Sequence, residues 1–205
     1  MNLPNHNFMK LLIATKNPGK VGEMKKFLGD NFEIVSLNEL SGAPEVEETG
    51  QTFEENAILK AKTYFKWSNI PVVADDAGLE IDYLNGEPGV KSRRWLGYEM
   101  TDQEMIDTAL EKLKNVPLEK RTAHLRTVGA YYDGKNILAE TAAIDGYIVD
   151  RQTAECEPGY PFRAIFMVPK FGKLYKDLTH EEHEQINHRK VVYEKLASRI
   201  LKLEK

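Results

Sequence analysis

Short apolar runs alternate with amphipathic segments along the chain, and this order is the strongest constraint on its fold. The apolar run Lys10–Thr15 is followed by Asn-Pro-Gly at residues 17–19, and apolar residues then recur at helical spacing from Val21 to Leu28. We therefore expect a strand, a loop and a helix at the start of the chain. The segment Phe32–Leu37 alternates as a second strand. Strands and helices in this order favour an α/β fold.

Three further helices are predicted from capping signals and spacing. Thr52 and Thr101 are each followed by Glu three residues later, which is the capping-box pattern. The apolar stripe behind Thr52 extends to about Trp67, and apolar residues keep helical spacing through Asn187–Leu203. A helix is expected in each of these places.

The remaining strands are predicted from apolar runs and turn residues. The run Pro71–Ala74 is expected to be a buried strand that ends with a turn at residues 75–78, and Leu79–Leu84 alternates as the next strand. Arg121–Tyr132 and Asn136–Ile144 flank an Asp-Gly pair that favours a hairpin, so two long antiparallel strands are expected there. The class is α/β with a mixed sheet.

Composition and charge exclude several classes of protein. With 41% hydrophobic residues in 205, the chain can bury a sizeable core, and it contains no repeat or Gly/Ser-rich linker, so residues 1–205 are expected to form one domain. A net charge of −4 argues against a nucleic-acid binder. No apolar stretch approaches the roughly 20 residues that span a bilayer, and one cysteine without a secretory signal suits the cytoplasm.

The segment Thr15–Lys20 is a candidate phosphate-binding loop. It lies between a predicted strand and a predicted helix, where backbone N–H groups and the positive helix end attract an anion, and Lys20 adds a charge. It lacks the Gly-Lys-Ser/Thr ending of a Walker sequence, and an ordinary Asn-Pro-Gly turn is the alternative.

An acidic loop and the helix after it are candidates for a metal site. Glu47 and Glu48 precede the helix that carries Asn56 and Lys60 one turn apart, away from its apolar stripe. Mg²⁺ is usually held by one or two carboxylates and substrate phosphates, which suits Glu47 or Glu48 acting with a distant Asp. The alternative is a solvated acidic loop.

Two adjacent aspartates follow the apolar run Pro71–Ala74, and charged groups are costly there unless they have partners. Because side chains alternate along a strand, we expect one carboxylate to face the site and the other to bind the scaffold. We expect Asp76 to be the carboxylate that faces the site. The alternative is an Asx turn before Gly78.

Cationic and aromatic residues later in the chain are candidates for nucleotide binding. The guanidinium of Arg94 suits bidentate contact with phosphate, although a basic surface loop is equally compatible with the sequence. His188 and Arg189 at a helix start offer donors for a nucleobase carbonyl. Tyr160 and Phe162 offer rings for stacking on a base, with core packing as the alternative.

In this order, these segments resemble the inosine triphosphate pyrophosphatase family over nearly the whole chain. The family pattern Glu-Glu-Thr-Gly-x-Thr-Phe-x-Glu-Asn-Ala-x-x-Lys-Ala is complete at residues 47–61, and Thr-x-Asn-x-x-Lys-x-x-Glu reads at 15–23. Asp-Asp-Ser-Gly-Leu reads at 75–79 with Ala77 in place of Ser, and Gly-x-Pro-Gly with the following Ser-x-Arg reads at 86–94.

The resemblance implies a long mixed, bent β-sheet flanked by helices, with two lobes around a central cleft, in a homodimer. It implies that Glu47 and Asp76 bind Mg²⁺, that Asp76 is the base, and that Lys60 holds the triphosphate together with Thr15, Asn17 and Lys20. Asp76, Lys60 and Glu47 are the predicted catalytic residues. The substrate-binding residues predicted from the resemblance and the patterns above are Thr15, Asn17, Lys20, Asn56, Arg94, Tyr160, Phe162, His188 and Arg189.

The base-binding part departs from the family pattern. Gly-Tyr-Pro-Phe-Arg-Ala at residues 159–164 stands where the family has Gly-Phe-Gly-Tyr/Trp-Asp-Pro, so Arg163 replaces a carboxylate. His183 and then Asn187 precede His188 and Arg189 where the family has Lys and then Ser. These departures leave the preferred base open.

The predicted reaction is Mg²⁺-dependent hydrolysis of noncanonical purine triphosphates (ITP, dITP, XTP) between the α and β phosphates, which would sanitise the nucleotide pool. A 6-oxo group accepts hydrogen bonds from His188 and Arg189, and a 6-amino group does not, so ATP should be disfavoured. The alternative is a nucleotide-binding or regulatory module of the same fold with little turnover. The sequence leaves open whether Glu47 or Glu48 is the main metal ligand.

Overall fold

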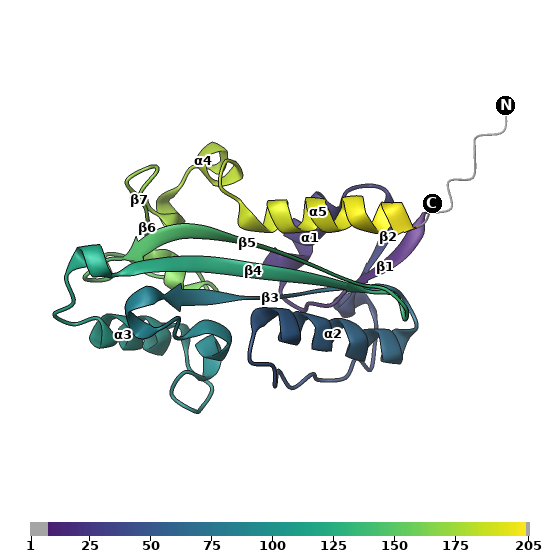
Figure 1. Cartoon of the computed structure of the whole chain (residues 1–205), viewed down its shortest axis with the longest axis horizontal. Coiled ribbons are helices and arrows are strands. Elements are labelled where there is room, and N and C mark those ends of the chain that lie inside the picture. The colour runs from purple at the N-terminus through teal and green to yellow at the C-terminus, as the bar shows by residue number, and fades with distance from the viewer. Residues whose placement is uncertain (1–7, 204–205) are drawn as a thin grey trace. The chain divides into compact units, whose positions relative to one another are not determined.

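The computed structural model describes residues 8–203, in which seven strands form one mixed sheet (Figure 1). The strands are β1 (Met9–Ile13), β2 (Phe32–Ser36), β3 (Val72–Ile81), β4 (Thr122–Tyr132), β5 (Ile137–Ile148), β6 (Phe166–Val168) and β7 (Lys173–Leu174). The α-helices are α1 (Pro18–Leu28), α2 (Phe53–Ser68), α3 (Asp102–Lys112), α4 (His180–Glu184) and α5 (His188–Leu203). Between residues 8 and 203, no helix combines the length and apolarity needed to cross a membrane.

The sheet has the strand order β2-β1-β3-β4-β5-β6-β7. Strand β1 is parallel to β2 and β3, whereas β6 is antiparallel to β5 and β7. Residues 133–136 join the neighbours β4 and β5, and Gly134 there has a φ of 95°. The α/β class, the mixed sheet and the long hairpin strands are confirmed.

The chain divides into two compact units. Within the described range, unit 1 comprises residues 8–76, 127–142 and 189–203, and unit 2 comprises residues 77–126 and 143–188. Strands β3, β4 and β5 contribute residues to both units. The predicted central cleft and the single domain stay predictions.

In unit 1, helices cover both faces of the sheet. Leu11 and Ile13 of β1 pack with buried residues of α1 and α5, whereas Leu12 and Ala14 pack with buried residues of α2. Because neighbouring side chains on a strand point to opposite faces, α1 and α5 cover one face and α2 covers the other. Figure 1 shows α5 and α2 on opposite sides of the sheet.

Strand β3 continues this alternation. Val73 belongs to the cluster of α1 and α5, and Ala74 belongs to the cluster of α2. The same alternation directs Asp75 towards α1 and α5, and Asp76 towards α2.

The predicted end of a strand at Ala74 is wrong. Strand β3 is continuous from Val72 to Ile81, and residues 82–84 form a 3-10 helix (η2) rather than the end of a second strand. The strand can continue through Asp75 and Asp76 because Lys20, Lys60 and Arg189 neutralise their carboxylates. The two carboxylates therefore do not need a turn that exposes them to water.

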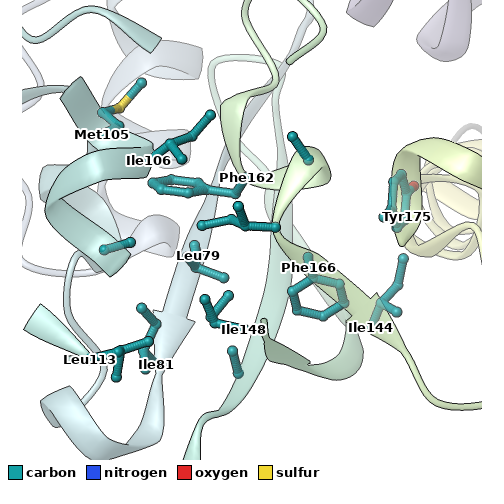
Figure 2. Packing of buried hydrophobic residues seen from close by; sticks show 14 of the residues in the cluster. Leu79, Ile81, Met105, Ile106, Leu113, Ile144, Ile148, Phe162, Phe166 and Tyr175 are labelled. Atoms are coloured by element: carbon teal, nitrogen blue, oxygen red, sulfur yellow. The ribbon is translucent and has the colours of Figure 1, made fainter. Parts of the chain in front are cut away.

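Unit 2 has its own apolar core, shown in Figure 2. Met105 and Ile106 of α3 pack in one cluster with Leu79 and Ile81 of β3. Phe162 joins this cluster from the 3-10 helix η5 (Pro161–Ala164).

Both capping boxes are confirmed. The Thr52 hydroxyl accepts a hydrogen bond from Glu55 N at 3.1 Å, and the Glu55 carboxylate accepts one from Thr52 N at 3.2 Å. Thr101 and Glu104 form the same reciprocal pair at the start of α3. The cap fixes the start of α2, and with it the positions of the polar residues that follow.

Candidate active site

Charged and amide side chains gather around Asp75 and Asp76 in unit 1. We call this group the charged cluster. Its members are Lys20, Glu23, Glu48, Asn56, Lys60, Asp75, Asp76 and Arg189.

Asp75 binds two cations that come from different helices. Its Oδ2 lies 2.9 Å from Lys20 Nζ of α1 and 3.4 Å from Arg189 Nη1 of α5, and only 1% of its side chain is exposed. Burial would raise the pKa of Asp75, but the charges of Lys20 and Arg189 outweigh it and lower the pKa to about 2. Asp75 is therefore an anion at neutral pH, and it binds both Lys20 and Arg189.

Asp76 faces α2, as the strand alternation requires. Asn56 Nδ2 donates a hydrogen bond to Asp76 Oδ2 at 3.1 Å, and Lys60 Nζ lies 3.6 Å from Oδ1. Burial raises the pKa of Asp76, and the charge of Lys60 offsets this only in part. The ammonium of Lys60 thus lies farther from the Asp76 carboxylate, at 3.6 Å, than the ammonium of Lys20 lies from that of Asp75, at 2.9 Å. The role of Asp76 as the base stays a prediction.

Lys60 joins the acidic loop to the strand. Its Nζ donates to Glu48 Oε1 at 2.7 Å and also approaches Asp76. Burial lowers the pKa of Lys60, but the surrounding carboxylates, Asp76 foremost, raise it above its ordinary value. Lys60 is therefore charged at neutral pH.

Gly50 connects the acidic loop to Asn56. Gly50 N donates to Asn56 Oδ1 at 2.7 Å, and a Cβ at position 50 would lie only 2.5 Å from that same oxygen. Only glycine allows this approach. The loop backbone thus fixes the amide that binds Asp76.

The start of α1 is shaped by two of the predicted phosphate ligands. Asn17 Oδ1 caps the helix by accepting from Gly19 N at 2.9 Å and Lys20 N at 3.3 Å, and Thr15 Oγ1 accepts from Asn17 N at 3.2 Å. The Asn17 oxygen therefore serves its own helix. Contact of Thr15 and Asn17 with a phosphate stays a prediction.

The carboxylates of Glu48 and Asp76 both approach Lys60 Nζ, so two anionic oxygen donors surround one cationic group. This donor set fits Mg²⁺, which takes one or two carboxylates and completes its shell with phosphate and water. The side chain of Glu47 is exposed, and the contact with Lys60 comes from Glu48. The assignment of Glu47 as a metal ligand stays a prediction beside the alternative Glu48.

A second group of polar and aromatic residues lies in unit 2. We call it the stacked cluster, and its members are Glu157, Tyr160, Arg163, Tyr175 and His183. The guanidinium of Arg163 lies 3.8 Å from the ring centroid of Tyr160 and 5.0 Å from that of Tyr175, and its Nη1 donates to Glu157 Oε2 at 2.9 Å. The Tyr175 hydroxyl and His183 Nε2 share a hydrogen bond of 2.5 Å.

The other candidates fall in different surroundings. Phe162 is buried in the core of unit 2, which is the alternative that the sequence left open for it, whereas Tyr160 is only half-buried. Arg94 is exposed in the 3-10 helix η3 (Gly89–Arg94). His188 is buried at the start of α5. The roles of Arg94 and His188 stay predictions.

Sequence reasoning missed several members of the two clusters. Glu23 was matched to the family pattern but given no role, although it lies one helical turn after Lys20; its Oε2 is 3.5 Å from Arg189 Nε. Nothing in the local pattern links Tyr175 or Glu157 to Arg163, because folding alone brings them together.

Comparisons with known proteins show which family the chain belongs to and which solved fold it shares. The model of the Ham1 family matches residues 11–199. The chain is 38% identical over 198 residues to a dITP/XTP pyrophosphatase of Leuconostoc mesenteroides, covering 94% of this chain and 96% of the relative. It is 40% identical over 188 residues to a dITP/XTP pyrophosphatase of Bacillus subtilis, covering 91% and 94%. The solved Staphylococcus aureus Ham1 protein is 36% identical with a TM-score of 0.82, covering 96% of this chain and 100% of that one.

Proposed function

The chain belongs to the Ham1 family, and on that premise we propose that it hydrolyses noncanonical purine nucleoside triphosphates, releasing pyrophosphate and the monophosphate. The two relatives described above carry the name dITP/XTP pyrophosphatase. The observation that carries the proposal is the meeting of Lys20, Lys60, Asp75 and Asp76 in one buried cluster. ITP, dITP and XTP are the proposed substrates.

Lys20 and Lys60 are the proposed phosphate ligands of unit 1. A triphosphate brings several negative charges, and the ammonium groups of Lys20 at the start of α1 and of Lys60 on α2 offset part of them. Lys20 is already oriented by Asp75 and Lys60 by Glu48, so neither side chain has to be ordered when substrate binds. Thr15, Asn17, Asn56 and Arg94 complete the proposed set.

Asp76 is the proposed base. Its carboxylate is oriented by Asn56 and Lys60, and we assign it to orient the attacking water and take its proton. Mg²⁺, held by Asp76 with Glu47 or Glu48, would neutralise charge on the phosphates and so favour attack at phosphorus. Positioning and charge neutralisation supply most of the catalysis in phosphoryl transfer.

The base is proposed to stack on Tyr160 and to be read by His188 and Arg189. A 6-oxo group accepts from these donors, and the 6-amino group of adenine does not. Arg189 already contacts Asp75 and Glu23, so its orientation is fixed before a nucleotide binds. The homodimer and the cytoplasmic location stay part of the proposal.

The test is pyrophosphate release from ITP, XTP, GTP and ATP with Mg²⁺. We expect faster release from ITP and XTP than from ATP, and none in excess chelator. Release that persists in chelator would contradict the role of Mg²⁺, and equal turnover of ATP and ITP would contradict the reading of the 6-oxo group. Binding of every nucleotide without release would favour the regulatory module.

A further inference from the structure

The stacked cluster contains a cation whose surroundings the proposed reaction does not explain. Arg163 is only 18% exposed, and its guanidinium lies over the Tyr160 ring at 3.8 Å. A guanidinium is planar and stacks on aromatic faces, where the attraction amounts to about 0.5–2 kcal/mol depending on exposure. Arg163 therefore covers one face of Tyr160.

The backbone holds these residues together. Tyr160 N donates to Glu157 O at 2.9 Å, and Arg163 N donates to Tyr160 O at 3.2 Å. Gly159 supplies the positive φ of 79° that this turn uses. The next two residues, Pro161 and Phe162, are buried, so the segment that carries Tyr160 and Arg163 is anchored in the protein.

Two further side chains restrict the guanidinium. Glu157 Oε2 accepts from Arg163 Nη1 at 2.9 Å, and the ring of Tyr175 lies on a second side at 5.0 Å. Tyr175 is itself fixed by burial and by the short hydrogen bond with His183. The cation is thus held by residues of its own segment and by the core.

We infer that Arg163 is a positioning residue that presents Tyr160 as a rigid stacking platform for the nucleobase, acting through the ring rather than on the edge of the base. This inference rests on the proposed function, because it takes a nucleobase as the ligand of Tyr160. A base can stack only on the ring face that the guanidinium leaves uncovered. Because every base has a π-face, the contribution of Arg163 is the same for all of them.

The test compares R163M with the parent, using R151M as the matched control because Arg151 is exposed in the same unit. We expect R163M to raise KM by about 3- to 30-fold, by the same factor for ITP, XTP, GTP and ATP, with kcat unchanged. Lys keeps the charge but loses the planar stack, so R163K should not restore KM. E157Q should give a smaller effect in the same direction.

A double-mutant cycle separates this role from a merely structural one. If Arg163 acts through the ring, R163M in the Tyr160→Ala background should add no further rise in KM. A general loss of folding would instead lower kcat and the melting temperature in both backgrounds. A change in the ratio of KM between ITP and ATP would show that Arg163 reads the base edge, and would overturn the inference.

Measuring the binding of the product IMP tests the role of Arg163 without requiring that the protein catalyse the proposed reaction. IMP carries the base and ribose 5-phosphate does not, so calorimetry with both needs no turnover. We expect R163M to weaken IMP binding by the same 3- to 30-fold and to leave ribose 5-phosphate binding unchanged. If the parent binds IMP but releases no pyrophosphate from ITP, the proposed function fails and the inference can stand. Equal binding of IMP by R163M and R151M, or no IMP binding by the parent, overturns it.

Discussion

The charged cluster of unit 1 and the stacked cluster of unit 2 hold their side chains in place by different forces. Asp75 is 1% exposed and is neutralised by two cations, whereas the carboxylate of Glu157 in the stacked cluster is 52% exposed. A buried ion pair is strongly destabilised when one partner is removed, but an exposed pair contributes little. The comparison teaches that removing a buried carboxylate of unit 1 should act on stability or on the chemical step, whereas removing Arg163 or Tyr160 of unit 2 should act on ligand affinity.

The sharpest test of this difference is Asp76→Asn. We expect kcat for ITP to fall by about 10²- to 10⁴-fold, because the amide cannot take the proton from water. IMP binding should change little, since Asp76 lies in the charged cluster and not in the stacked one. Asp30→Asn, an exposed change in the same unit, is the control. Asp76→Asn with parental kcat would remove Asp76 from the mechanism.

Asp75→Asn should break the charged cluster as a structure. The change leaves Lys20 and Arg189 without their shared anion, and we expect the free energy of unfolding to fall by about 3–5 kcal/mol. Urea unfolding measures it. E157Q should cost less than about 1 kcal/mol, because that pair is half-exposed. Similar losses of unfolding free energy in the two variants would contradict the proposed difference between the clusters.

The pH dependence of the free energy of unfolding should also depend on the carboxylate of Asp75. The pKa of Asp75 is about 2 in the folded protein and about 3.9 in an unfolded chain, so the unfolded state binds more protons between these values. The contribution, about 2–3 kcal/mol, is fully present above about pH 4 and is lost as the pH falls towards 2. The difference in unfolding free energy between the parent and Asp75→Asn should therefore shrink below pH 4. A constant difference would contradict this assignment.

The smallest expected effect belongs to the stacked cluster. Tyr160→Ala should weaken IMP binding by about 1–3 kcal/mol, the usual contribution of one stacked base, with kcat nearly unchanged. Tyr160→Phe keeps the ring and should stay close to the parent in calorimetry. If Tyr160→Ala lowers kcat as much as Asp76→Asn does, the assignment of the chemical step to the charged cluster and of base binding to the stacked cluster is wrong.

Local patterns were sufficient to predict α2 and its polar face. The Thr52 capping box set the start of the helix, and the spacing of Asn56 and Lys60 placed both on one side of it. Strand alternation predicted that the two aspartates would have different partners, and Asp75 and Asp76 do. These predictions succeeded because each depends on residues a few positions apart.

The contacts that could not be predicted from the sequence join segments that are far apart along the chain. Arg189 and Asp75 are 114 residues apart, and only the packing of α5 against the sheet brings them together. The same contacts explain the wrong strand end at Ala74, since Asp75 read as a turn residue when its cationic partners were unknown. The choice between Glu47 and Glu48 also depends on how the acidic loop folds against α2, which no local spacing encodes.

Gly50 has a consequence for how this protein tolerates change. Its missing side chain leaves room for the oxygen of Asn56, so any other residue at position 50 would push that amide away from Asp76. A scan of all substitutions along the acidic loop should therefore find Gly50 among the positions that tolerate replacement least, although glycine has no functional side chain. Designers who graft or shorten this loop have to retain that glycine, even when every charged residue around it is exchanged.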